Sequence, residues 1–180
     1  MRFGFALSMV VFAVFAVSPG LMPVVGTSTA QAQDVSYINT HRDWHAFQTT
    51  ENGNRVCYIA SQPTDEEGDY SQRGDVYVLV THRPYQDSRN EISFITGYTY
   101  QSDSEVTVSV GDETFTLFTH QDTAWAYDAE TDTRLVDAMR AGLNMVVRGR
   151  SSRGTLTTDT YSLLGFTAAL EEIDRACAPT

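Results

Sequence analysis

Residues 149–177 read GRSSRGTLTTDTYSLLGFTAALEEIDRAC, and this stretch decides the fold. An Arg/Gly turn and a Thr-rich strand precede a segment with four residues at intervals of four, three and four: Phe166, Leu170, Ile173 and Cys177. That spacing places the four side chains on one face of an α-helix. The cysteine that closes the helix is therefore expected to point into a core and not toward solvent.

The N-terminus predicts export. Met1 and Arg2 carry a positive charge, residues 3–17 are almost entirely apolar, and the small-residue triplet AQA at residues 30–32 follows a Pro-Gly break. This is the pattern of a secretory signal peptide over residues 1–32, cleaved after Ala32. The apolar run is shorter than the ~20 residues of a membrane-spanning helix, so we expect no transmembrane segment after cleavage. A retained membrane anchor is the alternative.

Composition restricts the kind of partner. Cleavage would leave 148 residues, enough for one domain with a sizeable core. These residues hold 11 Arg, no Lys, and 23 Asp and Glu, which gives a net charge of −12. Such a protein repels nucleic acid and anionic lipid head groups at long range. Nucleic-acid binding is therefore not expected.

Cys57 and Cys177 are the two cysteines of the chain. In an exported protein, such a pair is expected to form a disulfide bond, here between the start and the end of the folded region. A metal pair and a reactive thiol are the alternatives. Neither has support, because no C-x-x-C motif exists and no paired His at ligand spacing follows either cysteine.

From residue 44 onward, short runs of Val, Ile, Thr, Tyr and Phe alternate with turn residues, which predicts β-strands. We expect a polar leader at residues 33–43 and a single β domain at residues 44–180. The expected strands are 44–49, 55–61, 75–82, 91–96, 105–110, 113–118, 124–126, 144–150 and 155–161. An acidic loop at residues 62–73 and a helix at residues 131–141 complete the pattern. The predicted fold is mainly β, a β-sandwich or flattened barrel of about nine short strands with two short helices, one of them C-terminal.

Several motifs together resemble a known family. They are GYTY at 97–100 before a Val-alternating hairpin, FTLF at 115–118, AWA at 124–126, GRSSRGT at 149–155, DTYSL at 159–163, GF at 165–166 and Cys177. In this combination the chain resembles the invasion-associated locus B family, small exported proteins of alphaproteobacteria, from about Trp44 to Cys177. The resemblance implies no established enzymatic activity and no cofactor, and it carries over no binding residues. The two-cysteine pattern of the family matches Cys57 and Cys177, which supports the disulfide.

Two sets of residues are candidates for ligand binding. Arg148, Arg150 and Arg153 lie within six residues of one another, and guanidinium groups with turn amides suit a phosphate or carboxylate. The alternative is a hairpin turn whose arginines pair with neighbouring acids. The aromatic residues Tyr98, Tyr100 and Trp125 are candidates for an exposed aromatic surface, with packing in and around the core as the alternative.

Motifs of catalysis and metal binding are not expected in this chain. The His residues lack H-E-x-x-H spacing, the acidic residues at 65–69 lack the order of a calcium loop, and residues 149–153 lack the last Gly of a G-x-S-x-G elbow. The tripeptide RGD at residues 73–75 matches an integrin motif, but three-residue matches arise by chance, and Gly74 is expected to start a strand. No metal and no cofactor are therefore expected.

These observations predict a non-enzymatic cell-envelope protein, periplasmic or secreted, that acts as a binding or interaction module. Its expected partner is an unidentified envelope or surface protein. A carrier of anions or small ligands that uses the turn at residues 148–153 is the alternative.

Overall fold

The computed structural model describes residues 34–178. The expected signal peptide at residues 1–32 lies outside the described residues. Eleven strands and two α-helices follow the described chain in this order: β1 (Ser36–His41), β2 (Trp44–Glu51), β3 (Asn54–Ser61), β4 (Asp65–Gly68), β5 (Tyr77–Arg83), β6 (Ser88–Ile95), β7 (Glu105–Val110), β8 (Glu113–His120), β9 (Thr123–Trp125), α1 (Ala129–Ala141), β10 (Asn144–Arg150), β11 (Leu156–Ser162) and α2 (Phe166–Ala176). A short 3-10 turn, Pro84–Gln86, follows β5.

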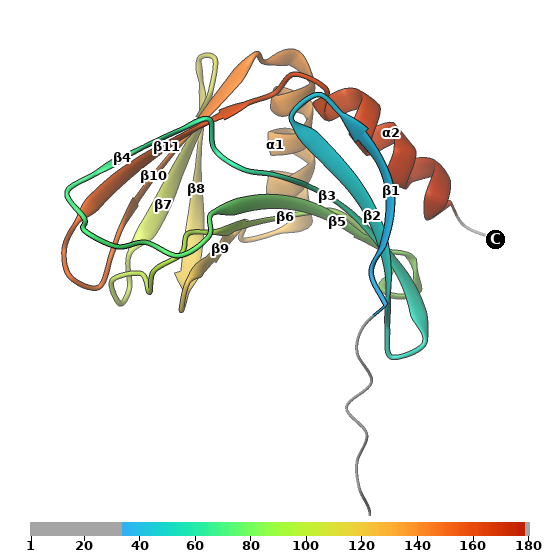
Figure 1. The fold of residues 1–180 in the computed structure, drawn as a ribbon, viewed down its shortest axis with the longest axis horizontal. Coiled ribbons are helices and arrows are strands. Elements are labelled where there is room, and N and C mark those ends of the chain that lie inside the picture. Colours follow the sequence, from blue (N-terminus) through green and yellow to red (C-terminus); the bar gives the residue numbers. More distant parts are fainter. Residues whose placement is uncertain (1–33, 179–180) are drawn as a thin grey trace, which may run out of the picture. The chain divides into compact units, whose positions relative to one another are not determined.

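All strands join one antiparallel sheet in the order β1-β2-β3-β5-β6-β9-β8-β7-β10-β11-β4. The sheet is strongly curved, so that the β2–β3–β5 part and the β10–β11 part face a common interior (Figure 1). Trp44 of β2 donates a hydrogen bond from its indole Nε1 to the carbonyl oxygen of Ser162 in β11, at 3.0 Å. Rings of Phe94 in β6 and Tyr161 in β11 also meet edge to face, with centroids 6.3 Å apart. Because β1 and β4 remain edges, the sheet does not close into a barrel.

The predicted fold class is confirmed: the protein is mainly β, with two helices, one of them C-terminal. Two segments differ from expectation. Residues of the expected polar leader form the edge strand β1, which pairs with β2, and residues of the expected acidic loop form the opposite edge strand β4, which pairs with β11. Both strands are mostly exposed and lack apolar alternation. Backbone hydrogen bonds to the neighbouring strand therefore hold them in place.

The interior strands follow the apolar alternation of the sequence. In β5 and the residue before it, Val76, Val78 and Val80 are buried, whereas Tyr77 and Leu79 on the other face are half-buried. Strand β5 lies between β3 and β6, so it is an interior strand of the sheet. The turn Asn52-Gly53 adopts positive φ angles of 51° and 82°, which Asn and Gly tolerate, and it connects β2 to β3 in two residues.

Helix α1 begins two residues earlier than predicted. The reason is Asp128, whose side chain accepts a hydrogen bond from the backbone N–H of Thr131 at 2.7 Å and so caps the helix. The helix ends at Ala141 before Gly142, as expected. Leu135, Val136 and Met139 form its buried side.

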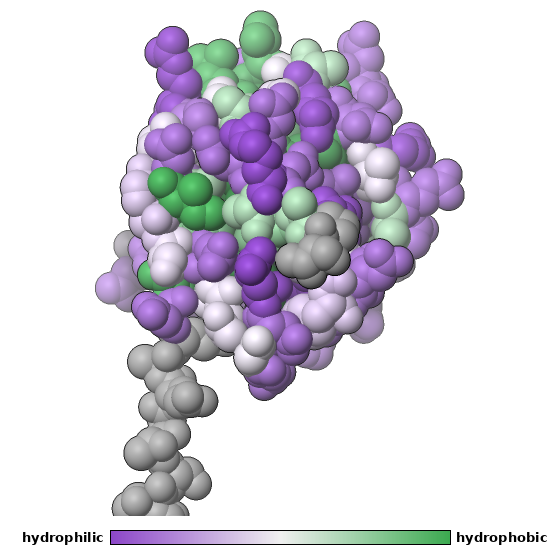
Figure 2. All heavy atoms as spheres, turned by 90° about the vertical axis from the view of Figure 1, so that its right-hand side faces the viewer, coloured by the Kyte–Doolittle hydropathy of each residue, from purple (hydrophilic) through white to green (hydrophobic). Residues whose placement is uncertain are grey.

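Helix α2 presents the predicted apolar face to the sheet. Phe166, Leu170, Ile173 and Cys177 are all fully buried, and the helix packs against β1, β2 and β3. The rings of Trp44 and Phe166 meet edge to face at 4.9 Å. Figure 2 shows the face of the molecule on which α2 and β1 lie, and hydrophilic residues dominate it, with hydrophobic areas that are small and separate. The helix therefore covers the sheet here and leaves a polar outer surface.

The expected disulfide between Cys57 and Cys177 is present, and both residues are fully buried. It joins β3 to the C-terminal end of α2 across 120 residues of sequence. His82, the cross-strand partner of Cys57, adds a contact at the same place, because its Nε2 lies 3.0 Å from Oδ1 of Asp174 in α2. The backbone N–H of Asn90 donates to His82 Nδ1, so Nε2 is the nitrogen that donates to Asp174.

Replacing both cysteines, Cys57→Ala/Cys177→Ala, should lower the free energy of unfolding by about 4–5 kcal/mol, the loop-closure entropy that the disulfide removes from the unfolded chain. Urea denaturation monitored by circular dichroism measures this loss. Wild-type protein treated with a reductant is the matched control and should show a similar midpoint. Equal midpoints for the oxidised protein, the reduced protein and the variant would contradict the prediction.

Candidate functional site

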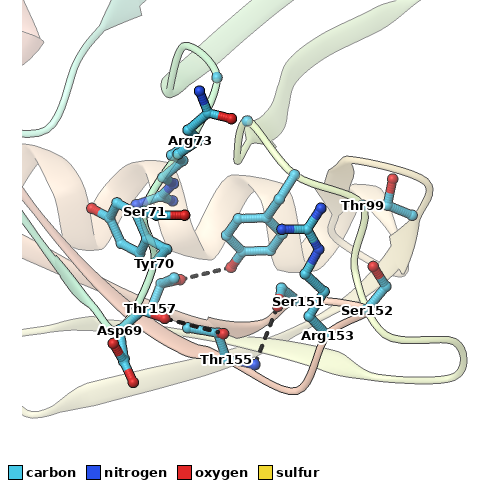
Figure 3. A pocket seen from close by; sticks show the side chains of 14 residues that line it. Asp69, Tyr70, Ser71, Arg73, Thr99, Ser151, Ser152, Arg153, Thr155 and Thr157 are labelled. Carbon is cyan, nitrogen blue, oxygen red and sulfur yellow. Dashed lines mark hydrogen bonds between the residues drawn. The ribbon is translucent and has the colours of Figure 1, made fainter.

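A cleft of about 680 Å³ lies where three segments meet. Its walls are residues 69–74, which follow β4, residues 97–99, which follow β6, and the turn that connects β10 to β11. Figure 3 shows the side chains of these segments around the cleft. Most of the lining side chains carry hydroxyl groups: Tyr70, Ser71, Tyr98, Thr99, Ser151, Ser152, Thr155 and Thr157.

A buried ion pair adjoins the cleft through Arg73, one of its lining residues. The guanidinium of Arg73 forms a forked pair with Asp159 of β11, with N–O distances of 2.5 and 2.7 Å. Both side chains are almost fully buried, with exposed fractions of 4% and 5%. Burial acts against the charge of Arg73, but the hydrogen bonds and the negative charge of Asp159 outweigh it and raise the pKa of Arg73. Arg73 therefore keeps its positive charge throughout the physiological range.

The remaining N–H groups of Arg73 connect the segments that line the cleft. Its Nε donates to the carbonyl oxygen of Thr96 at 2.8 Å, and Nη2 donates to the Thr96 hydroxyl at 3.0 Å. Two tyrosine rings enclose the guanidinium, with centroids 5.5 Å away for Tyr70 and 5.1 Å away for Tyr98. One side chain thus connects residues 70–75, the end of β6 and β11.

Gly74 and Gly97 bring two walls of the cleft into contact. The backbone N–H of Gly74 donates to the carbonyl oxygen of Gly97 at 2.9 Å. Gly97 has a φ of +70°, and an added Cβ would overlap the carbonyl oxygen of Gly74. Glycine is therefore required at position 97 both by the backbone conformation and by the close approach.

The turn that connects β10 to β11 is equally well fixed. Ser152 donates its backbone N–H to the carbonyl oxygen of Thr99 at 2.8 Å, and Ser151 bridges to Tyr100. The hydroxyl of Ser151 accepts a hydrogen bond from the N–H of Thr155 at 3.2 Å. The cleft is therefore preformed by a dense network within the protein, while the side chains of Ser152 and Arg153 remain exposed at its rim.

The structure does not bring the three candidate arginines to one site. Arg153 lines the cleft. Arg150 and Arg153 line a smaller cavity of about 400 Å³ beside it, but Nη1 of Arg150 already donates to the carbonyl oxygen of Gly154 at 2.8 Å. Arg148 is exposed on β10 and lines neither cavity.

The three candidate aromatic residues do not form one exposed surface. Tyr100 is only 5% exposed, and burial raises the pKa of its hydroxyl, so it belongs to the core. Tyr98 packs edge to face on Tyr100 and binds Thr157 at the cleft, with 2.6 Å between the hydroxyl oxygens. Trp125 lies apart from them in β9, where it stacks on Phe118.

Sequence reasoning missed the Arg73–Asp159 pair. A signal was present, because Thr157, Asp159 and Tyr161 alternate toward the interior along β11, and an aspartate at an inward position needs a partner. The same pair explains why the tripeptide at 73–75 is not an adhesion motif in this fold: its arginine side chain is buried. Within residues 34–178, no group of three His, Cys, Asp or Glu side chains is arranged to hold a metal ion.

These features define a small, disulfide-bonded β protein with a preformed polar cleft. A family model described as "Invasion associated locus B (IalB) protein" matches residues 44–174, and the chain therefore belongs to the invasion associated locus B family. Members of this family are exported bacterial proteins. In the described part of the chain, no helix has the length and apolar character to cross a membrane.

The fold is similar to the crystal structure of invasion associated protein B from Bartonella henselae, with a TM-score of 0.54. The alignment covers 77% of this chain and 95% of that chain, at 16% sequence identity. At this identity the likeness shows the fold alone. None of the curated proteins matches the chain.

The ion pair can be tested with a double-mutant cycle. Arg73→Met and Asp159→Leu should each lower the free energy of unfolding by about 3–5 kcal/mol, because each leaves an uncompensated buried charge. The double variant should recover most of this loss, since it buries neither charge. Urea denaturation measures all three. Glu66→Gln is the control: Glu66 lies 3.3 Å from the same guanidinium but is much more exposed, so its loss should cost less than about 1 kcal/mol. Additive losses in the double variant would contradict the interpretation.

Proposed function

We propose that this protein is a non-enzymatic binding module of the bacterial cell envelope, located in the periplasm or outside the cell, and that the polar cleft is its binding site. The observation that carries the proposal is the rigid, hydroxyl-rich cleft above the Arg73–Asp159 pair. A preformed site loses little entropy when a ligand enters, so polar contacts can contribute to affinity. Its alternating donors and acceptors suit a polar, extended segment of an envelope or surface protein.

The chemistry of the cleft supports binding more than catalysis. Its lining residues include no His and no Cys. The hydroxyl of Ser151 is engaged with Thr155, and the carboxylate of Asp69 points away from Ser151 in Figure 3. A serine nucleophile requires an adjacent base that is held by a third group. The lining residues do not provide this arrangement, whereas they provide many hydrogen-bonding groups.

The alternative function, a carrier of small anions, has weaker support. One observation favours it: Arg150 and Arg153 line the same small cavity. However, Arg150 is partly engaged by a carbonyl oxygen, and Asp69 contributes a negative charge to that cavity. The larger polar cleft is therefore a better-supported binding site than the small cavity at the arginine turn.

The cleft can be tested by partner capture. Mature protein immobilised on beads should retain a specific protein from a detergent extract of the native envelope. The variant Ser152→Trp should reduce the recovered amount of this protein at least tenfold, because the indole would fill the rim of the cleft. Ser102→Trp is the matched control, since Ser102 is exposed and does not line the cleft. Quantitative mass spectrometry measures recovery. Equal recovery with both variants would rule out the cleft as the binding site.

A second measurement separates the two functions. If the cleft binds a protein segment, 10 mM phosphate at constant ionic strength should leave the melting temperature unchanged, because no preformed anion site would be filled. A rise of several degrees that disappears in Arg150→Gln/Arg153→Gln would instead favour the anion carrier.

A further inference from the structure

A second cavity lies on another part of the sheet, between the first turn of α1 and strands β6, β8 and β9. We call it the aromatic groove; its volume is about 510 Å³. It shares no lining residue with the polar cleft. The residues that matter for its chemistry are Glu91, Phe118, His120, Trp125, Asp128 and Asp132.

Exposed aromatic rings form one side of the groove. Phe118 and Trp125 are stacked, with ring centroids 5.7 Å apart and an angle of 29° between the planes. Tyr127, which does not itself line the groove, tilts against Phe118 with the ring centroids 5.4 Å apart. Phe118 is 36% exposed and Tyr127 is 59% exposed, so no other described element covers these rings. Such rings offer their negative π faces to a ligand.

Asp132 also lines the groove and has an unused acceptor. Asp132 is only 9% exposed, and its Oδ1 accepts a hydrogen bond from the backbone N–H of Ile92 at 3.0 Å. Within residues 34–178, the other carboxylate oxygen receives no hydrogen bond, and no Arg lies within ion-pair distance. Burial raises the pKa of Asp132 to about 6, and the negative charges of Glu91 and Asp128 contribute to the rise. At neutral pH the carboxylate is ionised without a counter-charge.

The other charged groups of the groove do not supply the missing cation. Glu91 on β6 is paired with Arg83 at 2.6 Å, and Asp128 caps α1. His120 on β8 is the one other titratable group that lines the groove. None of the lining residues is Arg. The groove is therefore lined by stacked aromatic rings and by an ionised carboxylate that has no cationic partner among the lining residues.

We propose that the aromatic groove binds a positively charged side chain, Arg or Lys, presented by a basic segment of a protein partner. Its cationic group would lie against the faces of Trp125 and Phe118 and pair with the free oxygen of Asp132. Charge complementarity identifies this occupant, because aromatic faces and a desolvated carboxylate both attract a cation. The strongly acidic sequence also attracts a basic segment at long range. This site goes beyond the polar cleft and uses none of its residues.

The test uses the mature protein and a peptide probe, acetyl-Gly-Gly-Arg-Gly-Gly-amide, with the Gln peptide as the uncharged comparison. At pH 7.5 the Arg peptide should bind and the Gln peptide should not, as measured by calorimetry. In ¹⁵N-labelled protein the indole N–H signal of Trp125 should shift on titration, whereas that of Trp44, which is fully buried, should not.

Two variants with the same change of charge locate the site. Asp132→Asn keeps the acceptor for the Ile92 N–H but removes the charge, and should weaken binding at least tenfold. Asp137→Asn removes a charge from an exposed position of the same helix and should change binding by less than twofold. Trp125→Leu removes an aromatic face and should also abolish binding.

Ser152→Trp, which blocks the polar cleft, should bind the peptide normally, so that failure of one proposal is distinct from failure of the other.

The pH dependence adds an independent readout. Below pH 6 the wild-type affinity should fall about tenfold per pH unit as Asp132 takes up a proton, and Asp132→Asn should lose this dependence even though His120 is retained. Asp132→Asn should also melt at a higher temperature than wild type at pH 7.5, because it no longer buries an ionised group, and this shows that the variant is folded. Equal weakening by Asp132→Asn and Asp137→Asn, or unchanged binding in both Asp132→Asn and Trp125→Leu, would overturn the proposal.

Discussion

The buried pair of Arg73 and Asp159 is the interaction on which the organisation of the cleft depends. Two charges removed from water are tolerated only when they meet each other in good geometry and their other hydrogen-bonding groups are satisfied. Here that requirement places residues 70–75 against the end of β6 and against β11 in a single arrangement. The close contact of Gly74 with Gly97 and the tyrosine rings around the guanidinium follow from it. The pair fixes positions more than it adds net stability, since apolar groups in its place would avoid the desolvation cost.

Helices and strands that bury a row of apolar side chains could be predicted from the sequence. The face of α2, the alternating valines of the interior strands and the buried cysteines all follow a period that can be recognised without the structure. Strands β1 and β4 could not be found in this way, because most of their side chains face solvent and their partners lie elsewhere in the sheet. Arg73 and Asp159 are 86 residues apart, so no local pattern pairs them. The burial of Tyr100 could not be predicted either, because an aromatic residue gives the same sequence pattern in a core and on a surface.

The protein offers two chemically different surfaces on one sheet. The polar cleft is lined by hydroxyl groups and by Arg73, whose charge is matched by Asp159, so it suits a polar segment. The aromatic groove keeps an ionised carboxylate without a partner, so it suits a cation. Because the two share no lining residues, substitutions in one leave the other intact. The fold is similar in the Bartonella henselae protein at 16% identity, so surface residues can differ widely while the fold is kept.

The disulfide also sets an order of events during folding of the chain. Cys57 lies in the third strand, whereas Cys177 follows the last helix, 120 residues later. The bond can form only after nearly the whole domain has been synthesised, because its second sulfur arrives with the final element. Before that moment, the chain lacks both the covalent link and the apolar face of α2 that covers the first strands. The domain therefore reaches its full stability only when its last element is in place and the disulfide has formed.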